Sequence, residues 1–375
     1  MGAGHPGLAE PRTKEEWRAY LKMTSPERPE LPGLDTYRLM PEDQREEFND
    51  GRDAFHSALA LVLTEQMKRI HAAIDRRMRV NSHQAPGARR GIVLDGPPTI
   101  GKSTLVKLHA ADFERRFRSR YPERFEGGYE VDGRLIDTTP VVYLNIPAQA
   151  TPKDLSALLA TYLGVELRRA ATTREITNRV IQELAWVGVQ LVIIDDVHFL
   201  DLSAKEGKVA NDHLKYLANH VAATFVFTGA ELNTSGLFLE GHGSTRATQT
   251  AGRNSLYHVT AFGNRTEDDR REWARTVAAL EGSLCLLRHR PGSLVRLSAY
   301  LFDRTGGSIC GLSDLIRESA IEAVLSGEEA ITRRLMDRVE ISEAAQRQYR
   351  ETVRRRGSTA GKLAGPGTAA MVAGN

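Results

Sequence analysis

The sequence is poor in cysteine, with only Cys285 and Cys310 among its 375 residues. Two thiols cannot build the disulfide framework of a small secreted scaffold, and they are too few for a cysteine-rich zinc site. We expect both to be reduced, buried thiols, as is usual in a cytoplasmic protein. The length is sufficient for two or three domains, each with an apolar core.

Long apolar runs are also missing. The longest, at 58–63 and 191–194, are far shorter than the roughly 18 residues that a membrane-spanning helix needs. The first residues, MGAGHPGLAEP, contain no apolar segment of the kind that a secretory signal requires. The sequence therefore predicts a cytoplasmic protein without a membrane partner.

Neither sign of charge dominates. The chain has 51 lysines and arginines against 48 aspartates and glutamates, which gives a net charge of +3. This balance is compatible with nucleic-acid binding through a local basic patch, but it gives no independent argument for it. The class of function must therefore be predicted from motifs rather than from composition.

Between residues 91 and 262, short apolar segments alternate with segments that have the three- and four-residue apolar spacing of helices. Apolar strands separated by helices are typical of a parallel sheet covered on both faces, so we predict an α/β domain. An Asp-Gly turn within residues 127–140 predicts an inserted hairpin. The expected strands are 91–96, 140–148, 190–197, 224–230 and 255–262, and the expected helices between them are 103–117, 154–165, 176–188 and 212–222.

Four regions are expected along the chain. The first is a mostly extended arm with one short helix near 14–21, because it is rich in proline, glutamate and arginine. The second is the α/β domain, which begins with a leading helix from about residue 53. A small helical domain and a basic, disordered tail follow. The predicted bounds are 1–50, 51–262, 263–342 and 343–375.

A phosphate-binding motif follows the first expected strand. The residues GPPTIGKS at 96–103 fit the P-loop pattern GxxxxGK[ST] at every fixed position, and they open a helix as that motif requires. Glycines allow successive backbone N–H groups to surround phosphate oxygens, which the positive end of the helix also attracts. Lys102 can reach the β- and γ-phosphates, and the Ser103 hydroxyl can bind Mg²⁺. The predicted nucleotide-binding residues are Gly96, Pro97, Pro98, Thr99, Ile100, Gly101, Lys102, Ser103 and Thr104.

Two adjacent carboxylates end the third expected strand, in the sequence QLVIIDDVHFL. Asp195 fits the Walker B acid that holds Mg²⁺, directly or through water. Asp196 is placed to orient or deprotonate the water that attacks the γ-phosphate. A helix cap is the structural alternative for such a pair, but a P-loop upstream favours the metal and water roles.

The strand expected at 224–230, TFVFTGA, bears on the class of P-loop protein. In additional-strand ATPases, such a strand lies between the P-loop strand and the acidic strand, and it ends in a polar residue that senses the γ-phosphate. Thr228 is the candidate for this sensor. The acid pair and the helical domain after the fifth strand argue against a metabolic P-loop kinase.

Together, these segments resemble an AAA+ ATPase and, more narrowly, the TniB/TnsC-type regulators of transposition. The resemblance covers about residues 85–340. Its more family-specific parts are PVVYLNIPAQATPKDLSALLATYLGV at 140–165 and TGGSICGLSDLIRESAIEAVLSGEEAIT at 305–332. The resemblance implies a P-loop NTPase of the AAA+ type, with a parallel sheet flanked by helices and a small all-helical lid domain after it.

The resemblance also implies a function. Such regulators use ATP and Mg²⁺ to assemble as rings or filaments on duplex DNA, and they recruit a transposase together with a target-selection protein. An arginine finger completes the site of the neighbouring subunit, and Arg253 matches it by position, with Arg246 as the rival. Hydrolysis is expected to be slow, since Asp196 stands where many ATPases have glutamate. It is also expected to depend on assembly, since the finger comes from a neighbouring subunit.

A second function fits the same motifs. In a nucleotide switch of signalling or defence, ATP controls a partner protein and DNA has no part. Assembly on duplex DNA in the presence of ATP would separate this switch from a transposition regulator.

Overall fold

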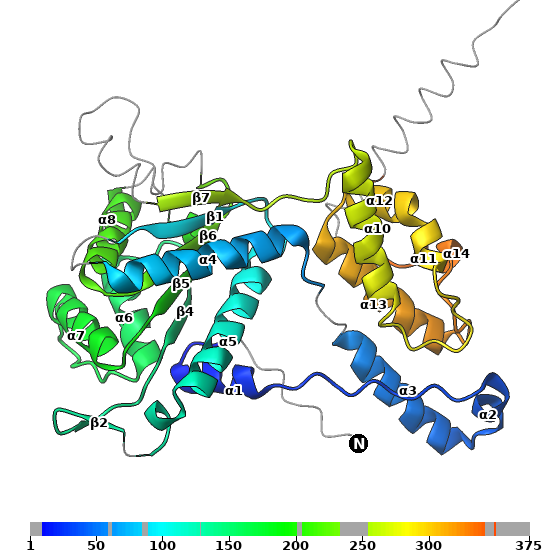
Figure 1. Cartoon of the computed structure of the whole chain (residues 1–375), viewed down its shortest axis with the longest axis horizontal. Coiled ribbons are helices and arrows are strands. Elements are labelled where there is room, and N and C mark those ends of the chain that lie inside the picture. The colour runs from blue at the N-terminus through cyan, green and yellow to red at the C-terminus, as the bar shows by residue number, and fades with distance from the viewer. Residues whose placement is uncertain are drawn as a thin grey trace, which may run out of the picture. The chain divides into compact units, whose positions relative to one another are not determined.

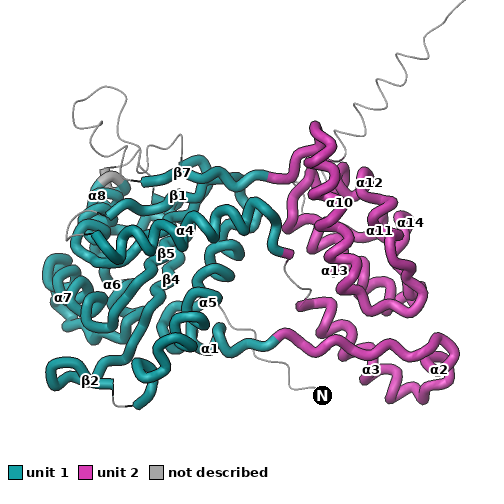
Figure 2. The backbone as a smooth tube through the Cα atoms, viewed as in Figure 1, with its two compact units in different colours: residues 1–24, 63–260 teal, residues 25–62, 261–375 magenta. Residues whose placement is uncertain are grey.

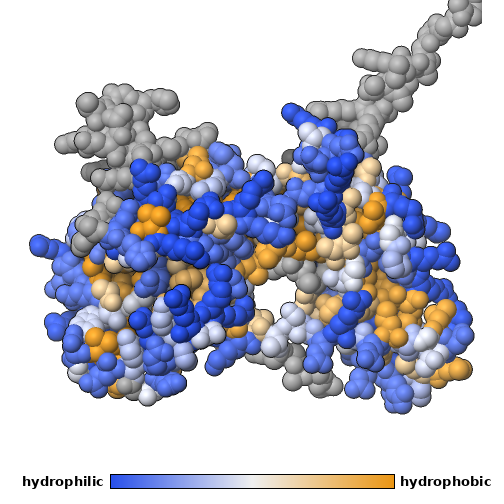
Figure 3. All heavy atoms as spheres, in the orientation of Figure 1, coloured by the Kyte–Doolittle hydropathy of each residue, from blue (hydrophilic) through white to orange (hydrophobic). Residues whose placement is uncertain are grey.

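The computed structural model describes residues 10–58, 62–84, 89–127, 129–200, 205–232, 254–341 and 349. The chain divides into two compact units (Figure 2): unit 1 comprises residues 1–24 and 63–260, and unit 2 comprises residues 25–62 and 261–375. Within the described residues, no helix is both long enough and apolar enough to cross a membrane. Hydrophilic side chains cover most of the face drawn in Figure 3, with smaller hydrophobic patches between them.

Unit 1 is built on a five-stranded parallel sheet with the order β4–β5–β6–β1–β7 (Figure 1). Strand β6 pairs with β5 on one side and with β1 on the other. The additional strand that we predict between the P-loop strand and the acidic strand is thus confirmed. The strands are β1 (Gly91–Asp95), β4 (Val141–Asn145), β5 (Leu191–Asp195), β6 (Thr224–Gly229) and β7 (Asn254–His258).

The strand sequences explain why the sheet lies inside the unit. Every residue of β1, β5 and β6 is buried, as expected for apolar strands with helices on both faces. The predicted α/β architecture is therefore confirmed. The helices of unit 1 are α1 (Lys14–Lys22), α4 (Glu65–His83), α5 (Lys102–Arg120), α6 (Pro152–Leu163), α7 (Thr173–Trp186) and α8 (Lys205–His220), with 3-10 helices at Pro122–Arg124 and Val197–Phe199.

The predicted hairpin is present. Strand β2 (Glu130–Val131) pairs antiparallel with β3 (Arg134–Leu135). The two residues between them, Asp132 and Gly133, have φ angles of 51° and 75°. Two positive φ angles identify a type I′ turn, which favours Asp-Gly because the second residue has no Cβ atom.

The N-terminal region differs from the extended arm that the sequence predicts for residues 1–50. The short helix predicted near 14–21 is present as α1 in unit 1, but the described part also forms α2 (Leu34–Leu39) and α3 (Glu42–Ser57) in unit 2. Helix α1 begins after Thr13, whose side chain accepts a hydrogen bond from the backbone N–H of Glu16. It buries Trp17, while α2 buries no residue. The residues that α3 buries are Arg52 and His56, so neither α2 nor α3 has the periodic apolar spacing by which a helix is recognised in a sequence.

The leading helix predicted from residue 53 is divided. Helix α3 ends at Ser57 in unit 2, and α4 begins at Glu65 in unit 1. Thr64 caps α4, since its hydroxyl accepts a hydrogen bond from the backbone N–H of Met67 at 3.2 Å. Such a cap satisfies a backbone donor that the first turn exposes, so it favours a new helix at this point.

Unit 2 is helical in its described part. Its core includes Trp273, Leu301, Leu312 and Ile316, and α3 packs against α13. The helical domain predicted for residues 263–342 therefore has a segment of the N-terminal region as an integral part. Besides α2 and α3, the helices are α10 (Glu267–Glu281), α11 (Ser293–Arg296), α12 (Ser298–Thr305), α13 (Ile309–Leu325) and α14 (Arg333–Met336).

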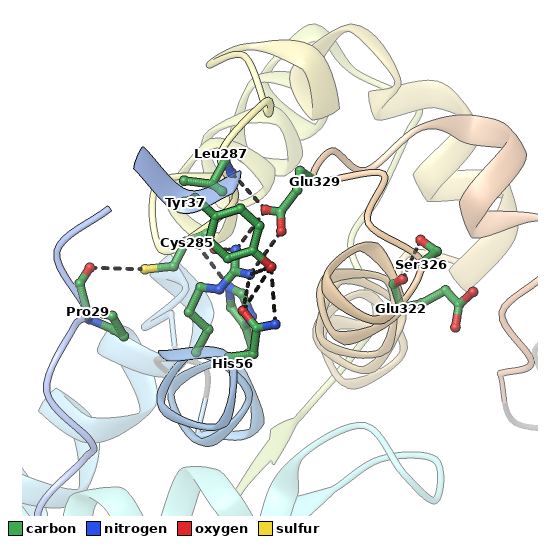
Figure 4. Close-up of polar contacts among 10 residues, drawn as sticks. Pro29, Tyr37, His56, Cys285, Leu287, Glu322, Ser326 and Glu329 are labelled. Atoms are coloured by element: carbon green, nitrogen blue, oxygen red, sulfur yellow. Dashed lines mark hydrogen bonds and ion pairs between the residues drawn. The ribbon is translucent and has the colours of Figure 1, made fainter. Parts of the chain in front are cut away.

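A buried ion pair attaches α3 to the loop after α13. Two guanidinium nitrogens of Arg52 donate to the Glu329 carboxylate at 2.7 and 2.9 Å, and the two side chains are 0% and 2% exposed. Figure 4 shows Glu329 facing Tyr37 and Leu287. The backbone N–H of Leu287 also donates to the Glu329 carboxylate at 3.1 Å. Two buried charges are tolerated because each is paired and hydrogen-bonded.

Breaking this pair is expected to destabilise unit 2 strongly. Glu329→Ala leaves the Arg52 charge buried without its partner, which costs about 3–5 kcal/mol in comparable cases. The urea dependence of hydrogen exchange in α3 and α13 measures the loss, because a chain of two units need not unfold in one step. The matched control is Glu267→Ala, which breaks the exposed pair with Arg271 and should have little effect.

The joint replacement Arg52→Met with Glu329→Gln should be more stable than Glu329→Ala, since no buried charge remains. Equal losses for Glu329→Ala and Glu267→Ala would contradict the importance of the buried pair.

Candidate nucleotide-binding site

The residues predicted to bind nucleotide meet at one edge of the sheet. Strands β1, β6 and β5 are parallel neighbours, so their C-terminal ends lie side by side. The loop 96–101 leaves β1 and enters α5, Asp195 ends β5, and Thr228 is the penultimate residue of β6. In open α/β sheets, ligands bind at this edge. Topology thus brings together groups that are far apart in the sequence.

The loop between β1 and α5 needs glycine at two positions. Gly101 is the N-cap of α5 and has a φ of 95°, in the left-handed region that favours glycine. At Gly96, a Cβ atom would lie 2.3 Å from the carbonyl oxygen of Val259, so a side chain does not fit. The loop therefore passes close to the chain after β7 and turns sharply into the helix. In this geometry, the backbone N–H groups of the loop would point toward a phosphate when one is bound.

Lys102 begins α5, and its side chain folds back over this loop. Its Nζ donates hydrogen bonds to the carbonyl oxygens of Gly96 and Pro97, each at 2.8 Å. Burial lowers the pKa of Lys102, while the negative charges of Asp195 and Asp196 act in the opposite direction. The P-loop lysine and the acid pair therefore lie within electrostatic reach of one another.

Asp195 is fully buried, and three groups that can donate hydrogen bonds surround its carboxylate. The Tyr143 hydroxyl lies 2.7 Å from Oδ2, and the backbone N–H of Asp196 donates to Oδ1 at 3.0 Å. The Thr228 hydroxyl also donates to Oδ1. A buried charge needs such partners, and together they fix the orientation of the carboxylate that is predicted to hold Mg²⁺. The predicted sensor residue is thus in direct contact with the predicted metal ligand.

Asp196 has different surroundings. It adopts a φ of 59°, which changes the direction of the chain at the end of β5. The side-chain amide of Asn145 donates to its Oδ2 at 3.2 Å. Burial raises the pKa of Asp196, and the negative charge of Asp195 adds to this effect. A carboxylate with an increased affinity for protons suits a general base, which is the role that the sequence predicts for Asp196.

The oxygen donors at this edge suit Mg²⁺. This ion prefers hard oxygen ligands and keeps several waters, with one or two carboxylates and the phosphates of a substrate. Ser103 and Asp195 are the residues that would hold it. In the described stretches of the chain, no group of three or more histidine, cysteine, aspartate or glutamate side chains could hold a metal by itself.

Two residues of this site belong to no motif in the sequence. Asn145 and Tyr143 lie on β4, which pairs with β5 so that they stand opposite Asp195 and Ile193. Asn145 could have been predicted from its position, because it is a polar residue at the end of the second strand. Tyr143 could not, because an aromatic residue within an apolar strand is ordinarily part of the core.

The two candidates for an arginine finger, Arg253 and Arg246, lie outside the described residues. Their roles remain predictions from the sequence.

One solved structure supports the fold, and a second is similar at a lower score. The Orc1 protein of Aeropyrum pernix, solved in complex with DNA, matches with a TM-score of 0.50 and 16% identity over 78% of this chain and 67% of that one. Cdc6p of Pyrobaculum aerophilum matches with a TM-score of 0.47 and 15% identity over 77% and 71% of the two chains. No curated protein sequence is significantly similar to this chain.

A family match narrows the assignment. Residues 59–240 match the family described as bacterial TniB protein. This segment of the chain is therefore TniB-like. The TniB-like segment contains the P-loop, the acid pair and strands β1, β4, β5 and β6, and it ends before β7. The nucleotide-binding edge of the sheet thus lies within the matched segment, whereas unit 2 lies almost entirely outside it.

Proposed function

We propose that the chain is a cytoplasmic, ATP- and Mg²⁺-dependent regulator that assembles on duplex DNA and directs transposition by recruiting a transposase. The observation that carries the proposal is the meeting of Lys102, Asp195 and Asp196 at one edge of the sheet, inside the TniB-like segment. This arrangement supports hydrolysis of ATP to ADP and phosphate, because it supplies a cation for the phosphates, a metal ligand and a base.

Each residue has a role in this proposal. Lys102 exchanges its two carbonyl partners for the β- and γ-phosphates, and Ser103 and Asp195 hold Mg²⁺, which neutralises phosphate charge when bound. Asp196 accepts the proton of the attacking water, and Asn145 orients Asp196. Thr228 reports the state of the γ-phosphate through its contact with the metal ligand.

We infer the oligomer and its partners from the similarity of residues 59–240 to the TniB family. A ring or filament places Arg253 of one subunit at the nucleotide of the next, so hydrolysis is slow until subunits assemble. A structural relative was solved in complex with DNA, which is consistent with duplex DNA as the template for assembly. The further partners are the transposase and a target-selection protein.

Duplex DNA is therefore expected to increase ATP turnover per subunit, and increasing salt should suppress that gain. Phosphate contacts release condensed counterions, so the affinity for DNA falls steeply with salt concentration. The measurement is steady-state ATPase activity of the full chain against duplex concentration at several salt concentrations, with electron microscopy of the assemblies. DNA-free turnover over the same salt range is the control.

Two outcomes would contradict parts of this proposal. If the protein binds ATP but neither assembles on DNA nor responds to it, the nucleotide-switch function is favoured. If it does not bind ATP, the assignment of the site itself fails.

A further inference from the structure

The N-terminal arm, defined here as residues 10–22, docks on the helix that follows the P-loop. Trp17 is 1% exposed, and its indole N–H donates to Glu114 of α5 at 2.8 Å. The indole also stacks on Tyr143 of β4, with ring centroids 6.0 Å apart and planes inclined by 13°. The arm therefore contacts the strand whose side chains reach the acid pair.

Ion pairs hold the arm at two places. Asp137 accepts from two residues of α1, from Lys14 at 2.8 Å and from the two terminal nitrogens of Arg18 at 2.5 and 3.2 Å. Burial acts to raise the pKa of Asp137, but this pairing lowers it. At the first residue of the arm, Lys107 of α5 donates to Glu10 at 3.0 Å. The arm is thus bound by several contacts that are separate from the nucleotide-binding edge.

One side chain connects the arm to the candidate metal ligand. The Tyr143 hydroxyl lies 2.6 Å from Glu10 Oε1 and 2.7 Å from Asp195 Oδ2. A phenol has a single proton, so it can donate to only one of these carboxylates at a time. The carboxylate that does not receive the proton faces the hydroxyl lone pairs at short range. The hydroxyl therefore has two alternative orientations, each of which favours a different neighbour.

We propose that Tyr143 couples docking of the N-terminal arm to Mg²⁺–nucleotide binding at Asp195. Tyr143 and Glu10 are positioning residues in this proposal, which rests on the proposed function of the site. When the charge of Asp195 is shared with Mg²⁺, its carboxylate becomes a weaker hydrogen-bond acceptor. The hydroxyl then donates to Glu10, and the arm is held more tightly.

The coupling must act in both directions. If Mg²⁺–nucleotide stabilises the docked arm, the docked arm increases the affinity for Mg²⁺–nucleotide by the same factor. Couplings of this kind typically amount to about 5- to 150-fold. Any segment or partner that displaces the arm would therefore weaken nucleotide binding without touching the P-loop.

Hydrogen exchange of the arm tests the first direction. In the full-length protein, a non-hydrolysable ATP analogue with Mg²⁺ should slow exchange in residues 13–22 by about fivefold or more relative to the analogue with EDTA. Tyr143→Phe keeps the buried ring and should abolish this difference. Glu10→Ala, at an exposed position, should also abolish it without risk to the fold. The matched control is Tyr162→Phe, which removes another buried hydroxyl, bonded to the Val141 carbonyl, and should keep the difference.

Affinity measurements test the reverse direction. Asp137→Asn weakens the docking of α1 at a distance from Tyr143, so it should increase the Mg²⁺ concentration needed for half-maximal nucleotide binding. In a Tyr143→Phe background, the same substitution should have no further effect.

Three outcomes would overturn the inference. The first is a wild-type arm whose exchange does not respond to Mg²⁺ although the analogue binds, which leaves the site assignment intact. The second is a Tyr143→Phe variant that responds as the wild type does. The third is a failure of the wild type to bind the analogue at all, which removes the proposed function as well.

Discussion

A mixture of Lys102→Ala and Arg253→Ala subunits is expected to hydrolyse ATP on duplex DNA, although neither variant does so alone. Lys102→Ala removes the cation whose Nζ lies over the P-loop, so that subunit should bind ATP weakly while remaining folded. Arg253→Ala keeps an intact P-loop but lacks the finger for its neighbour. In the mixture, a Lys102→Ala subunit donates Arg253 to the intact site of an Arg253→Ala subunit.

The expected recovery is large because an arginine finger stabilises charge in the transition state. Fingers of GTPase systems increase turnover by ~10³–10⁵, and a trans-acting residue supplies nothing to an isolated subunit. The measurement is ATPase activity as the ratio of the two variants changes at constant total protein. Turnover should be maximal at intermediate ratios.

A mixture of Arg246→Ala and Lys102→Ala subunits is the control, because it tests the rival arginine in the same way. If Arg253→Ala and Lys102→Ala subunits are shown to co-assemble and the mixture stays inactive, Arg253 is not the trans-acting residue. Arg246 is then the next to test. Normal ATP affinity of Lys102→Ala, by titration calorimetry, would contradict the P-loop assignment itself.

Asp196→Asn is expected to retain ATP binding and to lose most hydrolysis. The amide cannot accept the proton of the attacking water, and general-base catalysis typically contributes ~10²–10⁴ to the rate. The variant should therefore accumulate in the ATP-bound, assembled form. Asp195→Asn is the matched control, since it removes the predicted metal ligand and should instead impair Mg²⁺-dependent nucleotide binding.

The pH dependence provides an independent test of the role of Asp196. Burial and the charge of Asp195 raise the pKa of Asp196, and a base must be in its carboxylate form. Turnover should therefore fall as the pH decreases through this raised pKa. Asn145→Ala removes a hydrogen bond that stabilises the carboxylate form, so the fall should begin at a higher pH. An unchanged profile in Asn145→Ala, or normal turnover in Asp196→Asn, would exclude Asp196 as the base.

The parts of the site that lie on consecutive residues could be predicted from the sequence. The P-loop is recognisable because its glycines, lysine and serine have fixed spacings within residues 96–103. Asp195 and Asp196 are recognisable because they directly follow an apolar strand. The position of β6 between β5 and β1 could also be predicted, since strand composition and the order of motifs were typical of additional-strand ATPases.

The sequence by itself thus determined the P-loop class, the α/β sheet and the main acids, because local geometry encodes each of them. Only the tertiary structure decided which distant side chains complete the site and where the N-terminal region belongs. Glu10 reaches Tyr143 across 133 residues, and Arg52 reaches Glu329 across 277. Such contacts depend on how strands and helices pack, and they leave no periodic pattern along the chain.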